Sequence, residues 1–255
     1  MDKVRIAAFD LDGTVLDGES PFILTRRLLL HHDMKVRTGL RMGVWGLKYR
    51  MRLPQRESTP RELLFSAFAG MPVEEVDAHI LRVYNKHIAK RVRPGARAEV
   101  ASVKEQGMVP ILASASFKPM TDAVVEELGF EGQVSTVMEE RGGVYTSRVV
   151  GEPVQGMEKL RQLQGYCDGR FGVGNWVLER AYSDHYSDIP MLQAAQHAVV
   201  TDPDGVLKKV ARVHGWEVVD WDPSKRFKRS KRRDERQAAK AQKQAIEAAS
   251  SASGE

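Results

Sequence analysis

The chain has 255 residues, of which 42% are hydrophobic and 29% are charged, and these proportions are typical of a globular protein with one or two domains. No uninterrupted apolar run approaches the roughly 20 residues that span a bilayer, which excludes a transmembrane helix. Cys167 is the only cysteine, so an intrachain disulfide is also excluded. The N-terminus lacks the charged, apolar and small-residue zones of a signal peptide. A cytoplasmic location is therefore predicted, and a peripheral membrane location stays open.

The net charge of +5 is unevenly distributed along the chain. Residues 225–255 hold ten Lys or Arg and four Asp or Glu, so this end carries +6 and residues 1–224 carry −1. Attraction to nucleic acid or to another polyanion is therefore expected only from the C-terminal end. Residues 223–255 lack an apolar stripe, which predicts a disordered basic tail. A polyanion-binding module that uses this tail is one functional alternative.

The first predicted elements are a buried strand and a long helical segment. The apolar run Val4–Phe9 ends abruptly at Asp10, as a buried parallel strand does. From about residue 21 to residue 90, apolar side chains recur at helical spacing, and Pro54 and Pro60 divide this segment into several helices. The segment is too long for a simple crossover between strands, so it is predicted to be an inserted helical cap.

Helices and strands then alternate along the chain. The predicted elements are a helix over Arg97–Gln106, a strand over Val109–Ala113, a helix over Thr121–Leu128 capped by Gly129, a hairpin turn over Arg141–Tyr145, a helix over Met157–Leu163, a strand over Glu179–Ser183, a helix over Ile189–Ala195 and a last core strand over Ala198–Thr201. This alternation predicts an α/β fold with a doubly wound, mostly parallel sheet and a Rossmann-like core. The predicted domains are an α/β core over 1–20 and 91–222, a helical cap domain over 21–90 and the basic tail over 223–255.

Asp10 and Asp12 form the strongest chemical signal. They stand two residues apart at the carboxyl end of the first predicted strand, where open α/β sheets bind ligands. Gly13 allows the backbone to turn sharply at this point. One carboxylate can attack phosphorus, while the other protonates the leaving oxygen and later activates water. The alternative is a strand end followed by an ordinary Asp-Gly turn.

Polar residues recur at later strand ends and at a helix start. Ser114 follows the predicted strand Val109–Ala113, where a hydroxyl and the next backbone N–H groups can hold a phosphoryl oxygen. Lys159 opposes the dipole in the first turn of a predicted helix, which indicates a nearby anion. Asp184 and Asp188 follow another strand and are the hard oxygen donors that Mg²⁺ prefers. The alternatives are a capping serine, a solvated surface lysine and an N-cap role for Asp188.

Taken in order, these segments resemble the four successive motifs of the haloacid dehalogenase superfamily. The similarity is closest to the phosphoserine-phosphatase-like branch, which carries a helical cap after the first motif. It extends from about residue 3 to residue 222 and is carried by Phe9-Asp10-Leu11-Asp12-Gly13-Thr14-Val15, Ala113-Ser114-Ala115-Ser116, Lys159, and Tyr182-Ser183-Asp184 through Asp188-Ile189-Pro190-Met191-Leu192. The resemblance implies a magnesium-dependent phosphatase that forms an aspartyl-phosphate intermediate.

The resemblance also implies a role for each residue of the reacting site. Asp10 would be the nucleophile, and Asp12 would be the general acid and base. Ser114, Ala115 and Lys159 would hold the phosphoryl group of the substrate.

The same resemblance implies a magnesium site. Its ligands would be Asp10, the backbone carbonyl of Asp12 and Asp184, with Asp188 as a ligand or as the partner of a ligand. A rival within the superfamily is the dehalogenase reaction, which uses a nucleophilic Asp without a metal. The three further carboxylates, those of Asp12, Asp184 and Asp188, favour the metal-dependent phosphatase.

Several positions bear on the identity of the substrate. Ser187 stands where phosphoserine phosphatases usually carry Asn, and Leu64 stands where they carry a cap Arg that binds the amino acid. Glu19 fits the acidic position that assists this Arg, and Arg61 lies one helical turn from the expected place. Phosphoserine phosphatase activity is therefore an alternative and not the favoured function.

A basic and apolar segment suggests a different substrate. Residues 26–56 hold eleven Lys, Arg or His residues interleaved with apolar ones, a mixture that suits a cap helix meeting an anionic lipid head group. Phosphatidylglycerophosphate phosphatases, which are related by the same resemblance, have caps in this position. The alternative is a solvated basic face over a packed apolar face. The expected substrate is thus a small phosphorylated molecule or a lipid head-group phosphate.

Overall fold

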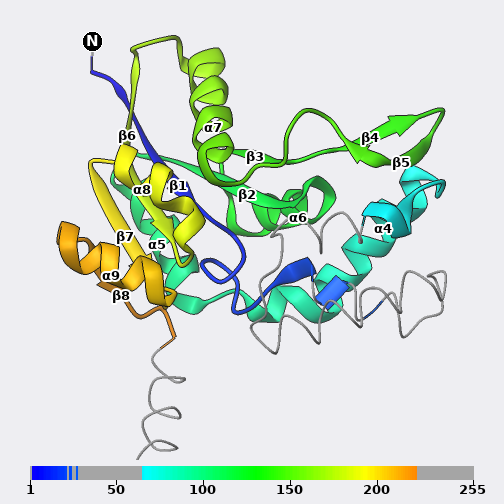
Figure 1. Cartoon of the computed structure of the whole chain (residues 1–255), viewed down its shortest axis with the longest axis horizontal. Coiled ribbons are helices and arrows are strands. Elements are labelled where there is room, and N and C mark those ends of the chain that lie inside the picture. The colour runs from blue at the N-terminus through cyan, green and yellow to red at the C-terminus, as the bar shows by residue number, and fades with distance from the viewer. Residues whose placement is uncertain (1, 22, 25–26, 28–64, 223–255) are drawn as a thin grey trace, which may run out of the picture. The chain divides into compact units, whose positions relative to one another are not determined.

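The computed structural model describes residues 2–21, 23–24, 27 and 65–222, which are drawn in colour in Figure 1. The chain divides into two compact units, Met1–Val219 and Asp220–Glu255, and all the described helices and strands belong to the first unit. Arg61, Leu64, the tail over 223–255 and nearly all of the basic segment over 26–56 lie outside the described residues. The expectations that concern them stay predictions.

A six-stranded sheet forms the centre of the first unit, and each of its strands runs parallel to its neighbours. Its strands are β1 Val4–Phe9, β2 Val109–Phe117, β3 Gly132–Thr136, β6 Trp176–Ser183, β7 His197–Thr201 and β8 Glu217–Val219. They are ordered β3-β2-β1-β6-β7-β8 across the sheet, so the chain winds outward from β1 in both directions. The predicted α/β fold with a doubly wound parallel sheet is confirmed.

Helices connect the strands and cover the sheet (Figure 1). They are α4 Val73–Val83, α5 Pro94–Glu105, α6 Lys118–Leu128, α7 Gly156–Phe171, α8 Ile189–Ala194 and α9 Gly205–His214. A π-helical turn, Tyr84–Ile88, and a 3₁₀ turn, Ala89–Arg91, continue α4 toward the core. A separate antiparallel hairpin consists of β4 Met138–Arg141 and β5 Val144–Val149, as the turn at residues 141–145 predicts.

The side chains of β1 alternate between two buried faces of the sheet. Ile6 and Ala8 belong to one core cluster together with apolar side chains of α7, α8 and α9. Phe9 stacks on Tyr182 of β6, with the ring centroids 4.1 Å apart. The Tyr182 hydroxyl donates to Glu99 of α5 at 2.5 Å, so α5 covers this second face. Burial on both faces explains why the sequence of β1 is an almost continuous apolar run.

The β4–β5 hairpin is hydrogen-bonded to the part of the chain that enters α4. Tyr145 of β5 accepts from the Gly70 N–H at 2.7 Å and donates its own N–H to the Met71 carbonyl at 3.0 Å. Its hydroxyl donates to Asp77 of α4 at 2.7 Å. Burial raises the pKa of Asp77, although the hydrogen bond from Tyr145 opposes this rise. The predicted cap segment is thus anchored to the core by way of this hairpin.

Several boundaries differ from the sequence-based expectation. The prediction that Ala198–Thr201 is the last core strand is wrong, because β8 pairs with β7 beyond it. β3 is also absent from the predicted strands, and both β3 and β8 are short edge strands without a continuous buried run. The predicted helix Met157–Leu163 extends to Phe171, because Cys167 and Phe171 in its second half also pack into the core.

Two further expectations concern the membrane and the cysteine. Within the described ranges, no helix combines the length and the apolar composition needed to cross a bilayer. Cys167 is a free, buried thiol, and burial raises its pKa to about 12. A thiol in this state carries little thiolate at neutral pH, so Cys167 is a packing residue.

Candidate active site

The parallel strands β2, β1 and β6 have their carboxyl ends beside one another, at the point where the winding order of the sheet reverses. β1 lies between β2 and β6, and its carboxyl end leads directly into Asp10. The backbone N–H of Asp10 donates to the carbonyl of Tyr182 in β6 at 2.9 Å, which continues the sheet pairing up to the carboxylate. Ser114 comes from β2, and Asp184 follows the end of β6. Topology therefore brings these three predicted site residues to the same edge.

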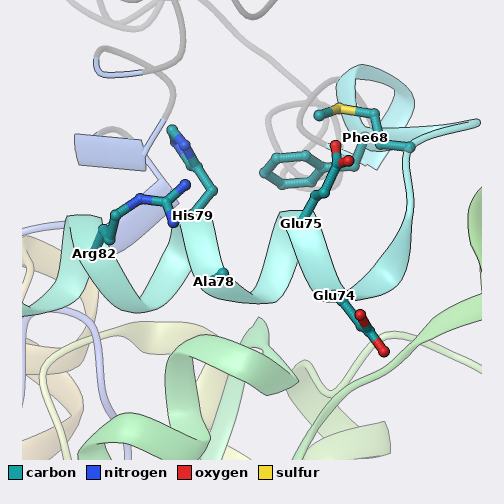
Figure 2. Close-up of a pocket in the computed structure, with 7 residues that line it drawn as sticks. Phe68, Glu74, Glu75, Ala78, His79 and Arg82 are labelled. Carbon is teal, nitrogen blue, oxygen red and sulfur yellow. The ribbon is translucent and has the colours of Figure 1, made fainter.

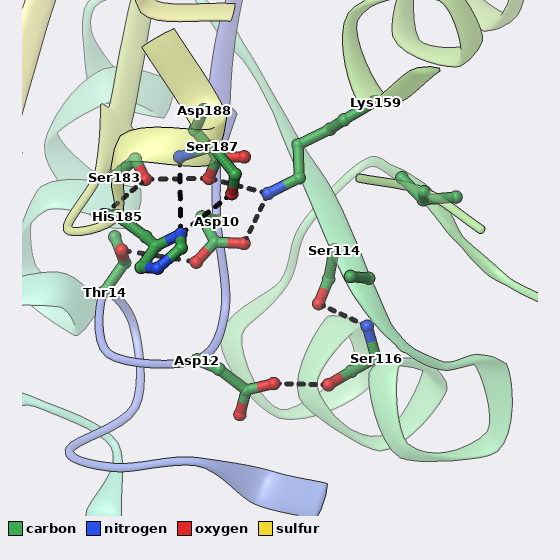
Figure 3. A network of polar contacts seen from close by, with 12 residues as sticks. Asp10, Asp12, Thr14, Ser114, Ser116, Lys159, Ser183, His185, Ser187 and Asp188 are labelled. Carbon is green, nitrogen blue, oxygen red and sulfur yellow. Dashed lines mark hydrogen bonds and ion pairs between the residues drawn. The ribbon is translucent and has the colours of Figure 1, made fainter. Parts of the chain in front are cut away.

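Lys159 joins two buried carboxylates. Figure 3 shows its side chain reaching from α7 to a point between Asp10 and Asp188. The Lys159 ammonium donates to Asp10 Oδ1 at 2.7 Å and to Asp188 Oδ2 at 2.7 Å. The relative exposures of the three residues are 3%, 6% and 1%, so water screens these ion pairs only weakly. The alternative that Lys159 is a solvated surface lysine is wrong.

The charges in this group affect one another strongly. Burial raises the pKa of Asp10 to about 7, the ammonium of Lys159 lowers it, and the Asp188 carboxylate raises it. Burial alone would lower the pKa of Lys159, but the two carboxylates hold it above its usual value. Lys159 therefore remains a cation over the whole neutral range, and it favours the ionised form of Asp10.

Asp188 stands immediately before α8, at its N-cap position, but its side chain makes no capping hydrogen bond to that helix. Its Oδ2 accepts from the Ser183 hydroxyl at 2.7 Å as well as from Lys159. Its Oδ1 is buried and has no hydrogen-bond partner. A buried carboxylate oxygen without a donor is costly in free energy, so Asp188 has an acceptor to offer to a further group at this site.

Asp12 has entirely different partners, although it lies only two residues from Asp10. Its Oδ1 accepts from the backbone N–H of Ser20 at 2.5 Å, and its Oδ2 accepts from the Ser20 hydroxyl at 3.1 Å. Oδ2 also accepts a very short hydrogen bond from the Ser116 hydroxyl. Figure 3 shows Asp12 turned toward Ser116 and away from Lys159. The two carboxylates of the first motif therefore occupy different chemical environments.

Gly13 is required where Asp184 approaches the turn after β1. Its φ of +79° is a left-handed conformation, and a Cβ at this position would lie 2.0 Å from Asp184 Oδ2. The carbonyl of Gly13 accepts from the buried guanidinium of Arg93 at 2.9 Å, which fixes the turn. Asp184 Oδ1 accepts from the Thr14 hydroxyl at 2.9 Å. Burial, followed by the charge of Asp10, raises the pKa of Asp184 to about 8.

A bulge in β2 shapes the segment that contains Ser114 and Ala115. Ser114 pairs with Ser135 of β3, but the next paired residue is Phe117, so Ala115 and Ser116 form a bulge. Within the bulge, the Ser116 N–H donates to the Ser114 hydroxyl at 3.0 Å. The carbonyl of Ala115 accepts from a hydroxyl of β3 at 3.0 Å. The bulge turns Ser116 toward Asp12 and keeps Ser114 beside it.

Two predicted positions bear on substrate specificity. Glu19 is exposed, and its charge contributes to the raised pKa of Asp184, so it faces the same acidic region. Arg61 lies outside the described residues. Their predicted roles in substrate binding stay predictions.

Sequence reasoning missed four hydroxyl groups at this site. Thr14, Ser116 and Ser183 stand within the motif segments, where their spacing from the carboxylates gave a signal that could have been used. Ser20 gave no such signal, since an isolated serine at a helix start has many possible roles. Only the tertiary structure brings Ser20 to Ser116, with 2.9 Å between the two hydroxyl oxygens.

The family model of haloacid dehalogenase-like hydrolases matches residues 7–193 of this chain. The chain is a haloacid dehalogenase-like hydrolase. Phosphoserine phosphatase SerB1 of Mycobacterium tuberculosis is 29% identical over 226 residues, which cover 87% of this chain and 72% of that protein. A phosphoserine phosphatase of a Polaromonas species is 27% identical over 199 residues, which cover 76% of this chain and 78% of that protein. The predicted family and the predicted class, a phosphoric monoester hydrolase, are confirmed.

Solved structures share the fold of this hydrolase. A protein of unknown function from Bordetella pertussis matches with a TM-score of 0.77 and 23% identity, covering 86% of this chain and 99% of that chain. A substrate-bound phosphoserine phosphatase matches with a TM-score of 0.57 and 19% identity, covering 82% of this chain and 90% of that chain. At these identities the likeness establishes the fold of the hydrolase and leaves its substrate open.

The carboxylates of this hydrolase fit a magnesium ion. In the described part of the chain, no three Asp, Glu, His or Cys side chains are arranged to hold a metal by themselves. Mg²⁺ needs fewer than three such side chains, because it commonly binds one or two carboxylates and completes its coordination shell with water and substrate oxygens. Asp10 and Asp184 both have raised pKa values, and part of the rise for Asp184 comes from the charge of Asp10. A divalent cation would relieve this repulsion.

A separate pocket of about 420 Å³ lies on α4, within the predicted cap (Figure 2). The described residues that line it are Phe68, Met71, Glu74, Glu75, Ala78, His79 and Arg82. None of them belongs to the group around Asp10. Two carboxylates against one guanidinium make this pocket unfavourable for a phosphate dianion, so the chemistry is assigned to the ends of the strands.

Proposed function

We propose that this hydrolase cleaves phosphate monoesters in two steps, through a phosphate ester formed on Asp10. In the first step an Asp10 oxygen attacks phosphorus, the bond to the leaving oxygen breaks, and Asp12 donates a proton to that oxygen. In the second step Asp12 removes a proton from water as the water oxygen attacks phosphorus. The bond between Asp10 and phosphorus then breaks, and inorganic phosphate leaves.

The neighbouring residues hold and neutralise the phosphoryl group in this proposal. Lys159 supplies a fixed positive charge, and the Ser114 hydroxyl with the backbone N–H of Ala115 donates to phosphoryl oxygens. Ser114 supports this role, because its oxygen accepts from Ser116 N–H and its own proton is left for donation.

The magnesium site would use acceptors from both strand ends. Asp10, the Asp12 backbone carbonyl and Asp184 would hold Mg²⁺, and Asp188 would serve as a ligand or as the partner of a ligand. Bound there, the ion would offset the negative charge that accumulates when a phosphate dianion meets several carboxylates.

One observation carries the proposal, namely the different surroundings of Asp10 and Asp12. Asp10 is paired with a buried cation, which favours an ionised oxygen nucleophile. Asp12 is held by hydroxyl groups, which can donate a hydrogen bond to a carboxylate and can accept one from a carboxylic acid. Carboxyl groups kept in contrasting environments commonly divide the nucleophilic and the acid–base roles.

Removing divalent metal is the direct test of this proposal. We expect activity on a soluble aryl phosphate to disappear in excess chelator and to return when Mg²⁺ is restored. Ca²⁺ should restore it poorly, because it favours more ligands and longer bonds than a compact phosphoryl-transfer site provides. Undiminished hydrolysis in chelator would contradict the magnesium site.

Two substrate classes remain candidates for this site. Phosphoserine is one candidate, because both relatives described above are named phosphoserine phosphatases. The other is a small phosphate or a lipid head-group phosphate at the membrane periphery, which the basic segment over 26–56 favours. We favour the second class, because Leu64 stands where an Arg for the amino acid carboxylate is expected. A buried carboxylate without a cation is costly. The cap over 21–90 would select the substrate in either case.

We therefore expect no marked preference for phosphoserine over simple phosphate esters. The measurement compares kcat/KM for phosphoserine, an aryl phosphate and dispersed phosphatidylglycerophosphate. An advantage of more than about a hundredfold for phosphoserine, or ~3 kcal/mol of transition-state discrimination, would contradict this expectation. Arg61 would then be the first residue to replace, in search of the missing positive charge.

A further inference from the structure

Three side-chain oxygens form a closed triangle beside the strand ends. Asp12 Oδ2 is 3.1 Å from the Ser20 hydroxyl and makes a very short hydrogen bond with the Ser116 hydroxyl. The two hydroxyl oxygens are themselves 2.9 Å apart. Ser20 is 1% exposed and Ser116 is 3% exposed, so water does not compete for these contacts. Ser20 begins a helix after the first motif and Ser116 comes from the bulge in β2, so the triangle joins two separate elements.

The protons in this triangle can be counted. Each hydroxyl carries one proton, so an ionised Asp12 leaves two protons for three oxygen–oxygen contacts. When Asp12 carries a proton on Oδ2, three protons serve the three contacts. Asp12 can then hold its proton against one serine until the leaving oxygen takes it, after which both hydroxyls can donate to the carboxylate. The Ser20 N–H donates to Asp12 Oδ1 at 2.5 Å, and this bond does not depend on a proton at Oδ2.

We propose that Ser20 and Ser116 are positioning residues that hold Asp12 in one place through both of its proton transfers. A hydroxyl can reverse its donor and acceptor roles by rotating, whereas a backbone N–H or a lysine can only donate. The triangle therefore stabilises the acid that protonates the leaving oxygen and the carboxylate that next removes a proton from water. This inference rests on the proposed acid–base role of Asp12.

The experiment depends on the leaving group. A simple alkyl phosphate needs protonation of its leaving oxygen, whereas 4-nitrophenyl phosphate has an acidic leaving group that needs little help. Because general acid catalysis is worth about 10²- to 10⁴-fold, we expect Ser116→Ala to lower kcat/KM about 10- to 100-fold for the alkyl ester. The loss for the nitrophenyl ester should stay within about threefold. A purely structural defect would lower both values equally.

Ser20→Ala is the second variant, because it removes the other hydroxyl of the triangle and keeps the N–H bond to Asp12. We expect the same dependence on the leaving group, and a double Ser20→Ala, Ser116→Ala variant should lose little more than either single variant, since the triangle acts as a unit. Ser102→Ala is the matched control, because this serine lies on α5, where its hydroxyl accepts from the Gln106 side chain at 3.0 Å. It should leave both substrates unaffected.

The possible outcomes separate this inference from the proposed function. Asp12→Ala should show the largest dependence on the leaving group, and if it shows none, the acid–base role of Asp12 is wrong. If Asp12→Ala shows it and both serine variants lose activity equally on the two esters, the positioning role is overturned. An unchanged or increased rate on the alkyl ester would also overturn it, since the serines would then be holding Asp12 away from the leaving group.

Discussion

Replacing Asp10 with asparagine is expected to lower turnover by about 10⁴-fold or more, the scale on which the loss of a catalytic nucleophile acts. The amide has the size of the carboxylate but cannot form the phosphate ester on which both steps depend. The fold should survive, because Lys159 retains its second partner, Asp188 Oδ2, at 2.7 Å. Asparagine is also neutral, so the substitution removes a buried carboxyl group whose pKa burial raises to about 7.

The measurement pairs steady-state hydrolysis of an aryl phosphate with thermal unfolding of the same preparation. Asp122→Asn is a suitable control, because Asp122 is an exposed aspartate paired with Lys118 at 2.7 Å and should tolerate the change. A folded Asp10→Asn protein with near-native turnover would show that another residue is the nucleophile. Asp12 would then be the next residue to test, since it belongs to the same motif.

The ends of the buried strands are where the sequence was most informative. β1 is apolar on both faces and stops at a charged residue, so Asp10 could be placed without any knowledge of tertiary contacts. The same reasoning located Ser114 and Asp184, because parallel strands must end at a common edge. β8 escaped prediction for the converse reason. It has three residues, two of them exposed, and its strand structure depends on pairing with β7.

Partners within the site were less predictable than the positions of its residues. The sequence favoured a surface role for Lys159 when taken alone, but Lys159 is buried in a structure where α7 packs against the sheet. Asp188 had a plausible local role as an N-cap, but its Oδ2 is taken up by Lys159, 29 positions away, and by Ser183, five positions away. Local patterns cannot reveal contacts such as that of Lys159 with Asp10, because these two residues are 149 positions apart.

Lys159→Met should have the second large effect, on both activity and stability. Methionine keeps much of the length and apolar character of the lysine stem but removes the charge between Asp10 and Asp188. Turnover should fall by about 10³-fold, because the phosphoryl group loses its fixed positive partner. In chelator at pH 8, the variant should lose about 3–5 kcal/mol of unfolding free energy, since breaking a buried ion pair leaves charges unpaired.

The stability loss should depend on pH in a defined direction. Asp10 has a pKa of about 7 in the folded protein against an ordinary 3.8, so the folded state binds its proton more tightly than the unfolded chain does. The stability contribution of this carboxyl is therefore present below about pH 4 and is lost as pH rises toward 7. Without Lys159, whose charge lowers the pKa of Asp10, this loss becomes larger and extends to higher pH. The difference between the variant and the native protein should thus be larger at pH 8 than at pH 5.

Chemical unfolding in chelator at the two pH values measures this difference, and Lys118→Met provides the matched control. Lys118 also lies 2.7 Å from an aspartate, but both side chains of that pair are 47% exposed. Exposed ion pairs are typically worth less than ~1 kcal/mol, so the control should unfold like the native protein at both pH values. An equal loss for Lys159→Met at pH 5 and pH 8 would mean that the packing of the lysine stem or its pair with Asp188, and not its charge beside Asp10, accounts for the lost stability.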